Sequence, residues 1–588
     1  MIRARLLLTH STQALPGEIK MPHLRTRKLA PSLSFSAGLM ATTVLCGLTY
    51  TPSALADDDA FLRPGNLLVS RVVYDNNPAN LTPGVTVLPP GCTSGCATAT
   101  ADGTYPGVFN NDAVDGSFGI TSKIVLDQMT RSGHLISSLE VPNSSQPNIA
   151  MTSDQMVGSF SSKSEVALNL STDKRVVTFM GYLASVDTLD VSNSNTPFVI
   201  DKTNPVHGAF YRVVVQVDAR GKFHFTKSNA YSGNNGRAAI LNAEGNEVYT
   251  AGNAGNGSKV QPDGVVVGTG AQILTPSKEP LNSQADPGQP TPVGSFNITE
   301  LGITPTDKIG KDTNFRGLTI FNNVIYTTKG SGGNGVDTVY FVDTSGPADS
   351  NGNPHACPNG TGLPGPFATL PTTPLFSGNV PGKGVFPYNM CVLKGFNTVL
   401  ANASTDSFPF GLWFADANTL YIADEGNGLA KSFSGGVFPD ATGQTKAGLQ
   451  KWVFDSTLDQ WKLAYVLTTG LDLGVPYTVD NYPTGINAAT GLPWSPATDG
   501  LRNLTGRLDG DEVTIWAVTS TVSGSGDQGA DPNKLVMIKD KLKATSLPEH
   551  ESFKTVRTAR FAEVLRGVSF TPGTGLSHDD DDDGHDQH

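Results

Sequence analysis

Four arginines stand at equivalent points of a pattern that recurs along this 588-residue chain: Arg237, Arg316, Arg502 and Arg566. Each lies at the start of an apolar run. A guanidinium presents a planar fork of N–H donors that suits carboxylates and phosphates. If the pattern closes into a ring, the four arginines form a collar, and the collar predicts an anionic ligand. Lys329, at the end of a second β-rich run, is a further candidate for the same ligand.

The collar has an alternative interpretation. Each arginine could instead pair with an Asp or a backbone carbonyl of the neighbouring repeat and hold the ring together, because a ring of like charges is costly unless it is paired. The two other repeats carry Phe410 and Glu165 near this position.

Oxygen-bearing side chains near the same strand ends predict a second kind of chemistry. They are Glu165, Asn314, Asp424, Glu425 and Asp499. Such groups bind Ca²⁺ or another divalent ion, and paired carboxylates act as general acid and base. Asp424 and Glu425 are adjacent in an expected strand and point to opposite sides, so a solvated loop edge is the alternative. No cofactor is certain from the sequence.

Several familiar catalytic motifs are missing from the sequence. It contains no G-x-S-x-G, no H-E-x-x-H and no EF-hand loop. The residue pattern therefore gives no support to a serine nucleophile or to zinc hydrolysis.

The elements that must position these residues are short strands. Composition favours them, with 64 glycines, 39 prolines and only 16% charged residues. Hairpin-like segments start near Glu165, Gly236, Phe315, Pro409 and Leu501, and turn residues such as Asn322-Asn323 and Asp509-Gly510 lie inside them. A third strand is expected to end at each of Asp127, Asp218, Asp343, Asp455 and Asp540. We interpret these aspartates as turn residues that bind their own downstream backbone.

The recurrence predicts blades. The hairpins start 71 to 94 residues apart, which leaves room for four strands per repeat. "LRGVSFTP" (565–572) resembles a first strand without a second, and "NLLVSRVVYD" (66–75) a second without a first. Joined, they complete one blade from both chain ends and leave no free edge. The expected fold is all-β, a single β-propeller of six four-stranded blades, or seven if 257–312 contains another.

This repeated pattern of strands and turns resembles that of NHL-type and YVTN (YncE-like) β-propellers over residues 57–575. The resemblance implies binding of a ligand or a protein partner. Some related-looking propellers are metal-dependent lactonases or lyases with a central ion held by Glu, Asp and Asn. We therefore expect a binding protein with a small anionic ligand or a protein partner. The alternative is a metal-dependent hydrolase, lactonase or lyase, and whether the chain is an enzyme stays open.

The expected second-to-third strand connections identify a working face. All but one are long: 76–121, 184–208, 252–270, 425–447 and 520–533. Elaborated loops on a rigid scaffold usually carry function. We expect the ligand on this long-loop face, at the mouth of a central channel.

The N-terminus predicts export. The pattern of residues 1–56 is typical of a signal peptide, with Arg25, Arg27 and Lys28 before an apolar stretch and "ALA" at 54–56. Met21 is an alternative start. The apolar stretch is too short and polar to span a membrane well. We expect a periplasmic or secreted monomer without a membrane anchor.

Charge and cysteines agree with export. Of 41 Lys/Arg and 53 Asp/Glu, six and one lie in the signal, which leaves 35 and 52 and a net charge of -17. This field disfavours nucleic acid. Four cysteines remain, and Cys92–Cys96 with Cys357–Cys391 is the simplest of three disulfide pairings. A metal site at the cysteines is the alternative.

The C-terminal segment 576–588 differs from the rest of the chain. It contains five consecutive Asp and three His. The repelling charges predict a disordered, solubilising tail, and loose binding of divalent ions by the histidines is the alternative.

Overall fold

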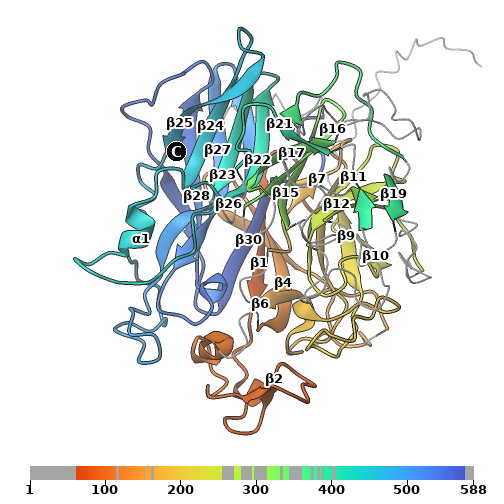
Figure 1. Ribbon diagram of the computed structural model, residues 1–588, viewed down its shortest axis with the longest axis vertical. Coiled ribbons are helices and arrows are strands. Elements are labelled where there is room, and N and C mark those ends of the chain that lie inside the picture. Colours follow the sequence, from red (N-terminus) through yellow and green to blue (C-terminus); the bar gives the residue numbers. More distant parts are fainter. Residues whose placement is uncertain are drawn as a thin grey trace, which may run out of the picture. The chain divides into compact units, whose positions relative to one another are not determined.

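Strands make up nearly all of the regular structure in the computed structural model shown in Figure 1. The structure describes residues 61–113, 118–150, 152–160, 164–253, 270–279, 295–296, 314–330, 336–342, 361–372, 377–380, 384–386, 390–399 and 406–576. The expected signal peptide and the Asp-rich tail from residue 577 onward lie outside these residues, so both stay predictions.

The expected hairpins form where the turn residues allow them. Asn322 and Asn323, with φ of 48° and 59°, join β15 (Phe315–Phe321) to β16 (Val324–Lys329). Two consecutive residues with positive φ make the turn whose twist matches paired strands. Gly510, with φ of 63°, lies in the turn between β26 (Ala497–Asp509) and β27 (Glu512–Val522).

Six sheets follow, which we number as blades 1 to 6 and describe from the innermost strand outward. Blade 1 contains β30 (Glu563–Phe570), β1 (Leu67–Val73), β4 (Ile120–Met129) and β5 (Leu135–Glu140), and β6 (Gly158–Phe160) also pairs with β4. Blade 2 contains β7 (Asn169–Leu170), β8 (Val176–Tyr182), β9 (Arg212–Asp218) and β10 (Phe223–Ser228). Blade 3 contains β11 (Gly236–Leu241), β12 (Val248–Gly252), β13 (Ala271–Leu274) and β14 (Ser295–Phe296).

The second half of the chain forms the other three blades. Blade 4 contains β15, β16, β17 (Thr338–Val342) and β21 (Met390–Leu393), with β18 (Thr361–Gly362) beside β21. Blade 5 contains β22 (Pro409–Asp416), β23 (Thr419–Asp424), β24 (Gly448–Asp455) and β25 (Gln460–Leu467). Blade 6 contains β26, β27, β28 (Lys534–Lys541) and β29 (Lys554–Thr558). Other short elements include β2 (Val87–Leu88), β3 (Ala97–Thr98), β19 (Ser377–Val380), β20 (Gly384–Phe386) and the helix α1 (Pro439–Thr442).

The innermost strands form a closed ring. β7 contacts β11, and contacts continue from β11 to β15, β22, β26, β30 and back to β7. In blade 1, β1 pairs with β30 from the C-terminal end and with β4, with Leu67 opposite both Phe570 and Met129. The fold is therefore an all-β propeller, and both ends of the chain share one blade, as predicted.

Two details of the expectation change. The structure has six blades, and the stretch suspected of a seventh supplies strands to blade 3, where Gln272 in β13 pairs with Ser295 in β14. The first strand of blade 2 is shorter than the sequence pattern indicates. Val166 has a φ of 69°, which interrupts the extended backbone before β7 begins at Asn169.

The core lies between adjacent blades. Tyr326 of blade 4 packs against Phe414 of blade 5, with ring centroids 4.7 Å apart. β23 is buried along its whole length. Because each blade covers its neighbour's apolar face, a single blade is not a stable unit and the ring is.

The repeated third-strand aspartates divide into two kinds. Asp218 and Asp455 accept backbone N–H groups of their turns, at 2.8 Å from Lys222 and 2.9 Å from Thr457, which confirms the turn interpretation. That interpretation is wrong for Asp127 and Asp540, which lie inside β4 and β28 with fully buried side chains. Both form ion pairs between strands instead. Asp343 lies outside the described residues.

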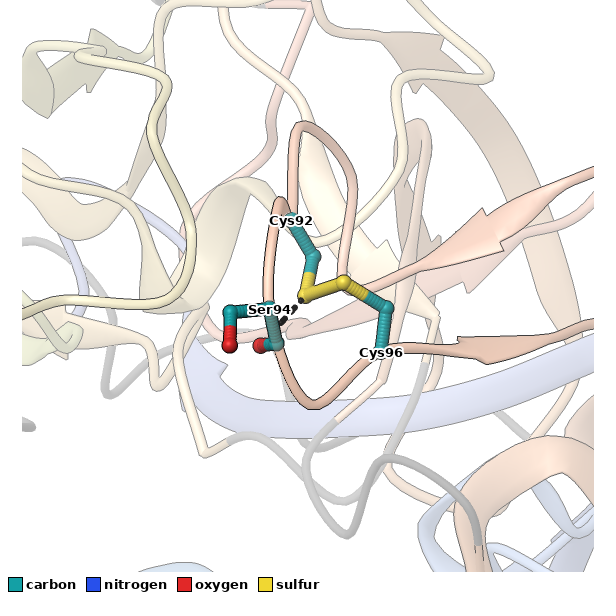
Figure 2. Close-up of a disulfide and its surroundings, with 3 residues drawn as sticks. All are labelled: Cys92, Ser94 and Cys96. Atoms are coloured by element: carbon teal, nitrogen blue, oxygen red, sulfur yellow. Dashed lines mark hydrogen bonds between the residues drawn. A yellow bond between two sulfur atoms is a disulfide. The ribbon is translucent and has the colours of Figure 1, made fainter.

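The predicted Cys92–Cys96 disulfide is present. It closes a short loop between β2 and β3, and Cys92 Sγ lies 3.3 Å from the carbonyl oxygen of Ser94 (Figure 2). Cys391 is also disulfide-bonded. Its predicted partner Cys357 lies outside the described residues, so that pairing stays a prediction. No helix within the described ranges is long and apolar enough to span a membrane.

The long loop before β4 packs through aromatic side chains against the loop between β25 and β26. Tyr105 lies 5.7 Å from Tyr482, measured between ring centroids. The Tyr482 hydroxyl donates to Asp531 Oδ1 at 2.7 Å, and Asp531 is almost completely buried. Burial raises the pKa of the Asp531 carboxyl to about 7.

This raised pKa gives a pH-dependent contribution to stability. Because the folded state holds the proton more tightly than the unfolded chain, the contribution is complete below about pH 4 and is lost as the pH rises through 7. Between pH 5 and pH 8 the loss amounts to about 2–3 kcal/mol, from roughly 1.4 kcal/mol per pKa unit. We expect Asp531→Asn to remove this component, so that urea unfolding of the variant falls less with pH than that of the wild type. Parallel pH profiles for the two proteins would contradict the assignment.

Candidate ligand-binding site

The ring of inner strands brings the six aligned positions together at one end. Arg237 Nη1 of blade 3 donates to the carbonyl oxygen of Phe315 in blade 4 at 2.7 Å. The guanidinium carbons of Arg316 and Arg502 lie 5.7 and 5.6 Å from the ring centroid of Phe410, between them in sequence. The charge of Glu165 acts to raise the pKa of both Arg237 and Arg566, so this carboxylate lies near the two arginines. The arginines predicted to form a collar, hereafter the arginine collar (Arg237, Arg316, Arg502 and Arg566), therefore do lie together.

The collar is also held by its neighbours, as the alternative interpretation proposed. Glu425 accepts from Arg502 Nε at 3.1 Å and lies 3.7 Å from Arg316 Nε. Arg566 Nη2 donates to the carbonyl oxygen of Ser159 at 2.9 Å. These contacts cross from blade to blade, so the arginines do hold the ring together. They do not exclude a ligand, because the Arg502 and Arg316 side chains remain 20% and 12% exposed.

Arg237 differs from the other collar arginines. It is only 4% exposed, and Nη1 donates to Asn314 Oδ1 and to the Phe315 carbonyl, which are both neutral. Among the described residues no carboxylate forms an ion pair with it, and its Nε has no hydrogen-bond partner. Burial and the charge of Arg316 lower the pKa of Arg237 well below its usual value. A buried cation with so little compensation is costly, and a bound anion would relieve it.

Tyr182 and Asn235 add polar groups to this site, and the sequence analysis did not identify them. Within the described ranges the Tyr182 hydroxyl and Asn235 Oδ1 have no hydrogen-bond partner, although both residues are fully buried. Burial and the carboxylate of Glu165 raise the pKa of Tyr182. Tyr182 ends the second strand of its blade, as Lys329 and Asp424 do in theirs. Aligning the ends of second strands, as well as the starts of first strands, would have found it.

Arg212 stabilises this corner. Its guanidinium carbon lies 5.2 Å from the ring centroid of Tyr182, and Nη2 donates to the Ser194 and Asn234 carbonyls at 2.8 and 2.6 Å. Burial lowers its pKa to about 10, so the group stays charged at neutral pH. A second buried cation therefore lies beside Tyr182.

Lys329 is near the collar but is already paired. Its ammonium nitrogen lies 2.7 Å from Asp337 Oδ1, and both side chains are buried. Burial raises the pKa of Asp337, while Lys329 and Arg316 oppose that shift. The ligand-binding role predicted for Lys329 stays a prediction, and the structure shows it in an internal ion pair.

The residues predicted to bind a metal are engaged by protein groups. Glu165 Oε1 accepts from the Ser159 backbone N–H at 2.6 Å, Asn314 accepts from Arg237, and Glu425 pairs with two arginines. In the part of the chain that the structure describes, no three His, Cys, Asp or Glu residues form a group that could hold a metal ion. The metal site stays a prediction that this geometry does not favour.

Asp424 and Asp499 are buried acids at the edge of the site. Asp424 Oδ2 accepts from the Phe408 N–H and from Gln450 Nε2, at 2.7 and 2.8 Å. Asp499 accepts from Gly428 N–H at 2.8 Å and Gln444 Nε2 at 2.6 Å. Burial raises the pKa of each to about 7. These hydrogen bonds fix the loop that follows β23 and so position Glu425, the next residue after Asp424.

Comparison with known proteins identifies no family. No family model matches the chain, and no curated protein matches it. Similar solved structures include a periplasmic gluconolactonase from Pseudomonas aeruginosa (11% identity, TM-score 0.33, covering 86% of this chain and 98% of that one). A Lactobacillus plantarum protein matches with 9% identity and TM-score 0.30, covering 85% and 83% of the two chains. A Bombyx mori β-fructofuranosidase matches with 8% identity and TM-score 0.26, covering 65% and 61%.

These likenesses assign no activity to this chain at such identities and TM-scores. The six-bladed propeller rests on the strand pairing described above. The resemblance to NHL-type and YncE-like propellers stays a prediction at the level of family.

Proposed function

We propose that this chain is an exported β-propeller, periplasmic or secreted, that binds a small anionic molecule at the arginine collar. The observation that carries the proposal is Arg237, a buried guanidinium whose partners among the described residues are neutral. Arg316 and Arg502, partly exposed at the same end, add positive charge for a ligand that reaches Arg237. A carboxylate or phosphate matches these donors in charge and geometry.

The collar also supplies directional groups for recognition. The Tyr182 hydroxyl can donate to an anionic oxygen, and Asn235 Oδ1 can accept from a ligand hydroxyl. A ligand with one anionic group and one hydroxyl would satisfy both. Leaving such groups without partners is unfavourable, so their satisfaction would favour this ligand over a bare ion.

Titration calorimetry in a chloride buffer tests the proposal, with phosphate, succinate and citrate as probes. We expect at least one probe to bind, and Arg237→Met to weaken it by about 10- to 100-fold, because a charge-assisted hydrogen bond contributes about 1.5–3 kcal/mol. Arg220→Ala, at an exposed turn, is the matched control and should bind like the wild type. Binding that is equal in Arg237→Met and wild type, or no binding of any probe, would exclude the proposal.

The alternative of a metal-dependent hydrolase has a separate test. Metal content and melting temperature would be measured on mature protein ending at residue 574, before and after chelation. One tightly held divalent ion whose removal lowers the melting temperature would favour the enzyme over the binding protein. Without such an ion, the assignment rests on the anion experiment.

A further inference from the structure

A cavity lies at the ends of the inner strands opposite the arginine collar. Its volume is about 770 Å³, and all six blades line it: Leu168–Thr172, Ile240, Thr319–Asn323, Leu412–Phe414, Leu504–Asp509 and Ser569–Phe570. These segments lie a few residues after the collar positions, where each first strand approaches its short hairpin or, in blade 1, the end of β30. The size falls within the roughly 300–1,000 Å³ of small-molecule sites. The sequence analysis placed function only on the long-loop face and missed this cavity.

Aromatic rings form part of the wall. Trp413 in β22 is partly exposed and lines the cavity. Its indole lies against the backbone of β26 at Gly506, where an added Cβ would come within 2.6 Å of the ring. Phe321 and Phe414 are stacked nearby, with centroids 4.6 Å apart and planes 9° apart. Gly506 therefore makes room for Trp413 and leaves an aromatic surface for a ligand.

The polar part of the wall is close to neutral. Arg507 and Asp509 pair with each other at 2.7 Å, and the Lys174 ammonium contacts the Gly575 carbonyl at 3.3 Å. Asn169 also lines the cavity, and within the described ranges its Nδ2 donor has no hydrogen-bond partner. Apart from Lys174, the wall offers amide and hydroxyl groups to a ligand. This chemistry differs from that of the arginine collar.

We propose that this cavity binds a neutral carbohydrate, a short oligosaccharide. A pyranose ring has an apolar C–H face, which packs on an aromatic ring, and an edge of hydroxyls that both donate and accept. Trp413 supplies the ring, and Asn169 supplies an amide that needs an acceptor. A purely apolar ligand would leave Asn169 without a partner, and an anion would find no buried unpaired cation among the described residues of the wall.

Tryptophan fluorescence and calorimetry of the mature chain test this site, with maltotriose, cellobiose and diacetylchitobiose as probes. We expect at least one probe to quench the emission and to bind saturably at about millimolar concentration or below. Trp413→Ala should lower the affinity at least tenfold and abolish the quenching. Trp494→Phe, in the long loop between β25 and β26, is the matched control and should change neither.

Two further variants keep the result interpretable. Asn169→Leu should weaken the saccharide several-fold while its melting temperature stays close to that of the wild type. Arg237→Met should leave saccharide binding unchanged, since it lies at the other end of the strands. The proposal is overturned if none of the saccharides binds at about 10 mM. It is also overturned if folded Trp413→Ala binds as the wild type does, or if Arg237→Met abolishes the binding.

Discussion

Replacement of Asp540 by alanine is expected to lower the free energy of unfolding by about 3–5 kcal/mol, because it leaves a buried ammonium group without its counter-charge. Lys451 Nζ of blade 5 lies 3.0 Å from Asp540 Oδ2 of blade 6, and neither side chain is exposed to solvent. The hydroxyls of Tyr421 and Tyr465 both donate to the same carboxylate, the latter at 2.6 Å. The variant would break this link between two blades.

A matched control exists at the same position of another repeat. Asp455 is the last residue of the third strand of blade 5 and Asp540 the last but one of the third strand of blade 6, but the ion pair of Asp455 with Lys462 is exposed at the surface. Asp455→Ala should therefore lower the free energy of unfolding far less than Asp540→Ala does. Adding Lys451→Met to Asp540→Ala should recover part of the stability, because it removes the uncompensated charge. Chemical denaturation measures all four proteins, and equal losses for Asp540→Ala and Asp455→Ala would contradict the account.

The different roles of Asp455 and Asp540 could not be predicted from the sequence. Turn chemistry is local, so Asn322-Asn323 and Asp509-Gly510 identified their hairpins correctly. The shared blade was also predictable, because the C-terminal end supplies a first strand without a second and the N-terminal end a second strand without a first. Whether a repeated aspartate accepts a turn N–H or a lysine depends on the neighbouring blade. The strand pattern contains no information about that neighbour.

In the candidate sites, too, the repeat pattern predicts some features, while others depend on neighbouring blades and loops. Equivalent positions in a repeat must lie together once the ring closes, so the collar was predictable from the alignment alone. The pairing of Glu425 with two arginines and the burial of Tyr182 depend on loop paths. The cavity beside Trp413 depends on Gly506, which lies 93 residues away in the next blade. A glycine in the middle of a strand is the only sequence signal, and it does not indicate which ring it accommodates.

One ring of strands therefore carries two kinds of chemistry. At the starts of the strands, four arginines lie together with Glu425 and Glu165 near them. At the ends, aromatic rings and amides line a space whose charged groups are largely paired. The strands themselves are a rigid scaffold, so each end can bind its own ligand without a change in the other. Binding at one end should leave affinity at the other unaltered, within the additivity expected for distant sites.

The charge balance at the collar depends on Glu425, and Glu425→Gln is expected to lower the free energy of unfolding by about 3 kcal/mol in chloride buffer. The side chain is 9% exposed and contacts Arg502 at 3.1 Å and Arg316 at 3.7 Å. Glutamine keeps the shape and removes the charge, so two guanidiniums lose the carboxylate between them. A bound anion can take over that role. An anion at 100 times its dissociation constant adds about 2.7 kcal/mol, enough to restore most of the loss.

The measurement is chemical denaturation of wild type and Glu425→Gln with and without phosphate, at matched ionic strength. Phosphate also stabilises proteins in general by exclusion from their surface, so a control must remove that component. Glu512→Gln is that control, because Glu512 pairs with Lys539 at the surface and the loss of its charge should change stability little. If phosphate stabilises Glu425→Gln no more than it stabilises Glu512→Gln, the anion does not replace the Glu425 carboxylate between Arg316 and Arg502. If the gain is specific to Glu425→Gln and disappears in Glu425→Gln/Arg237→Met, the anion sits against Arg237, the cation on which the proposed function depends.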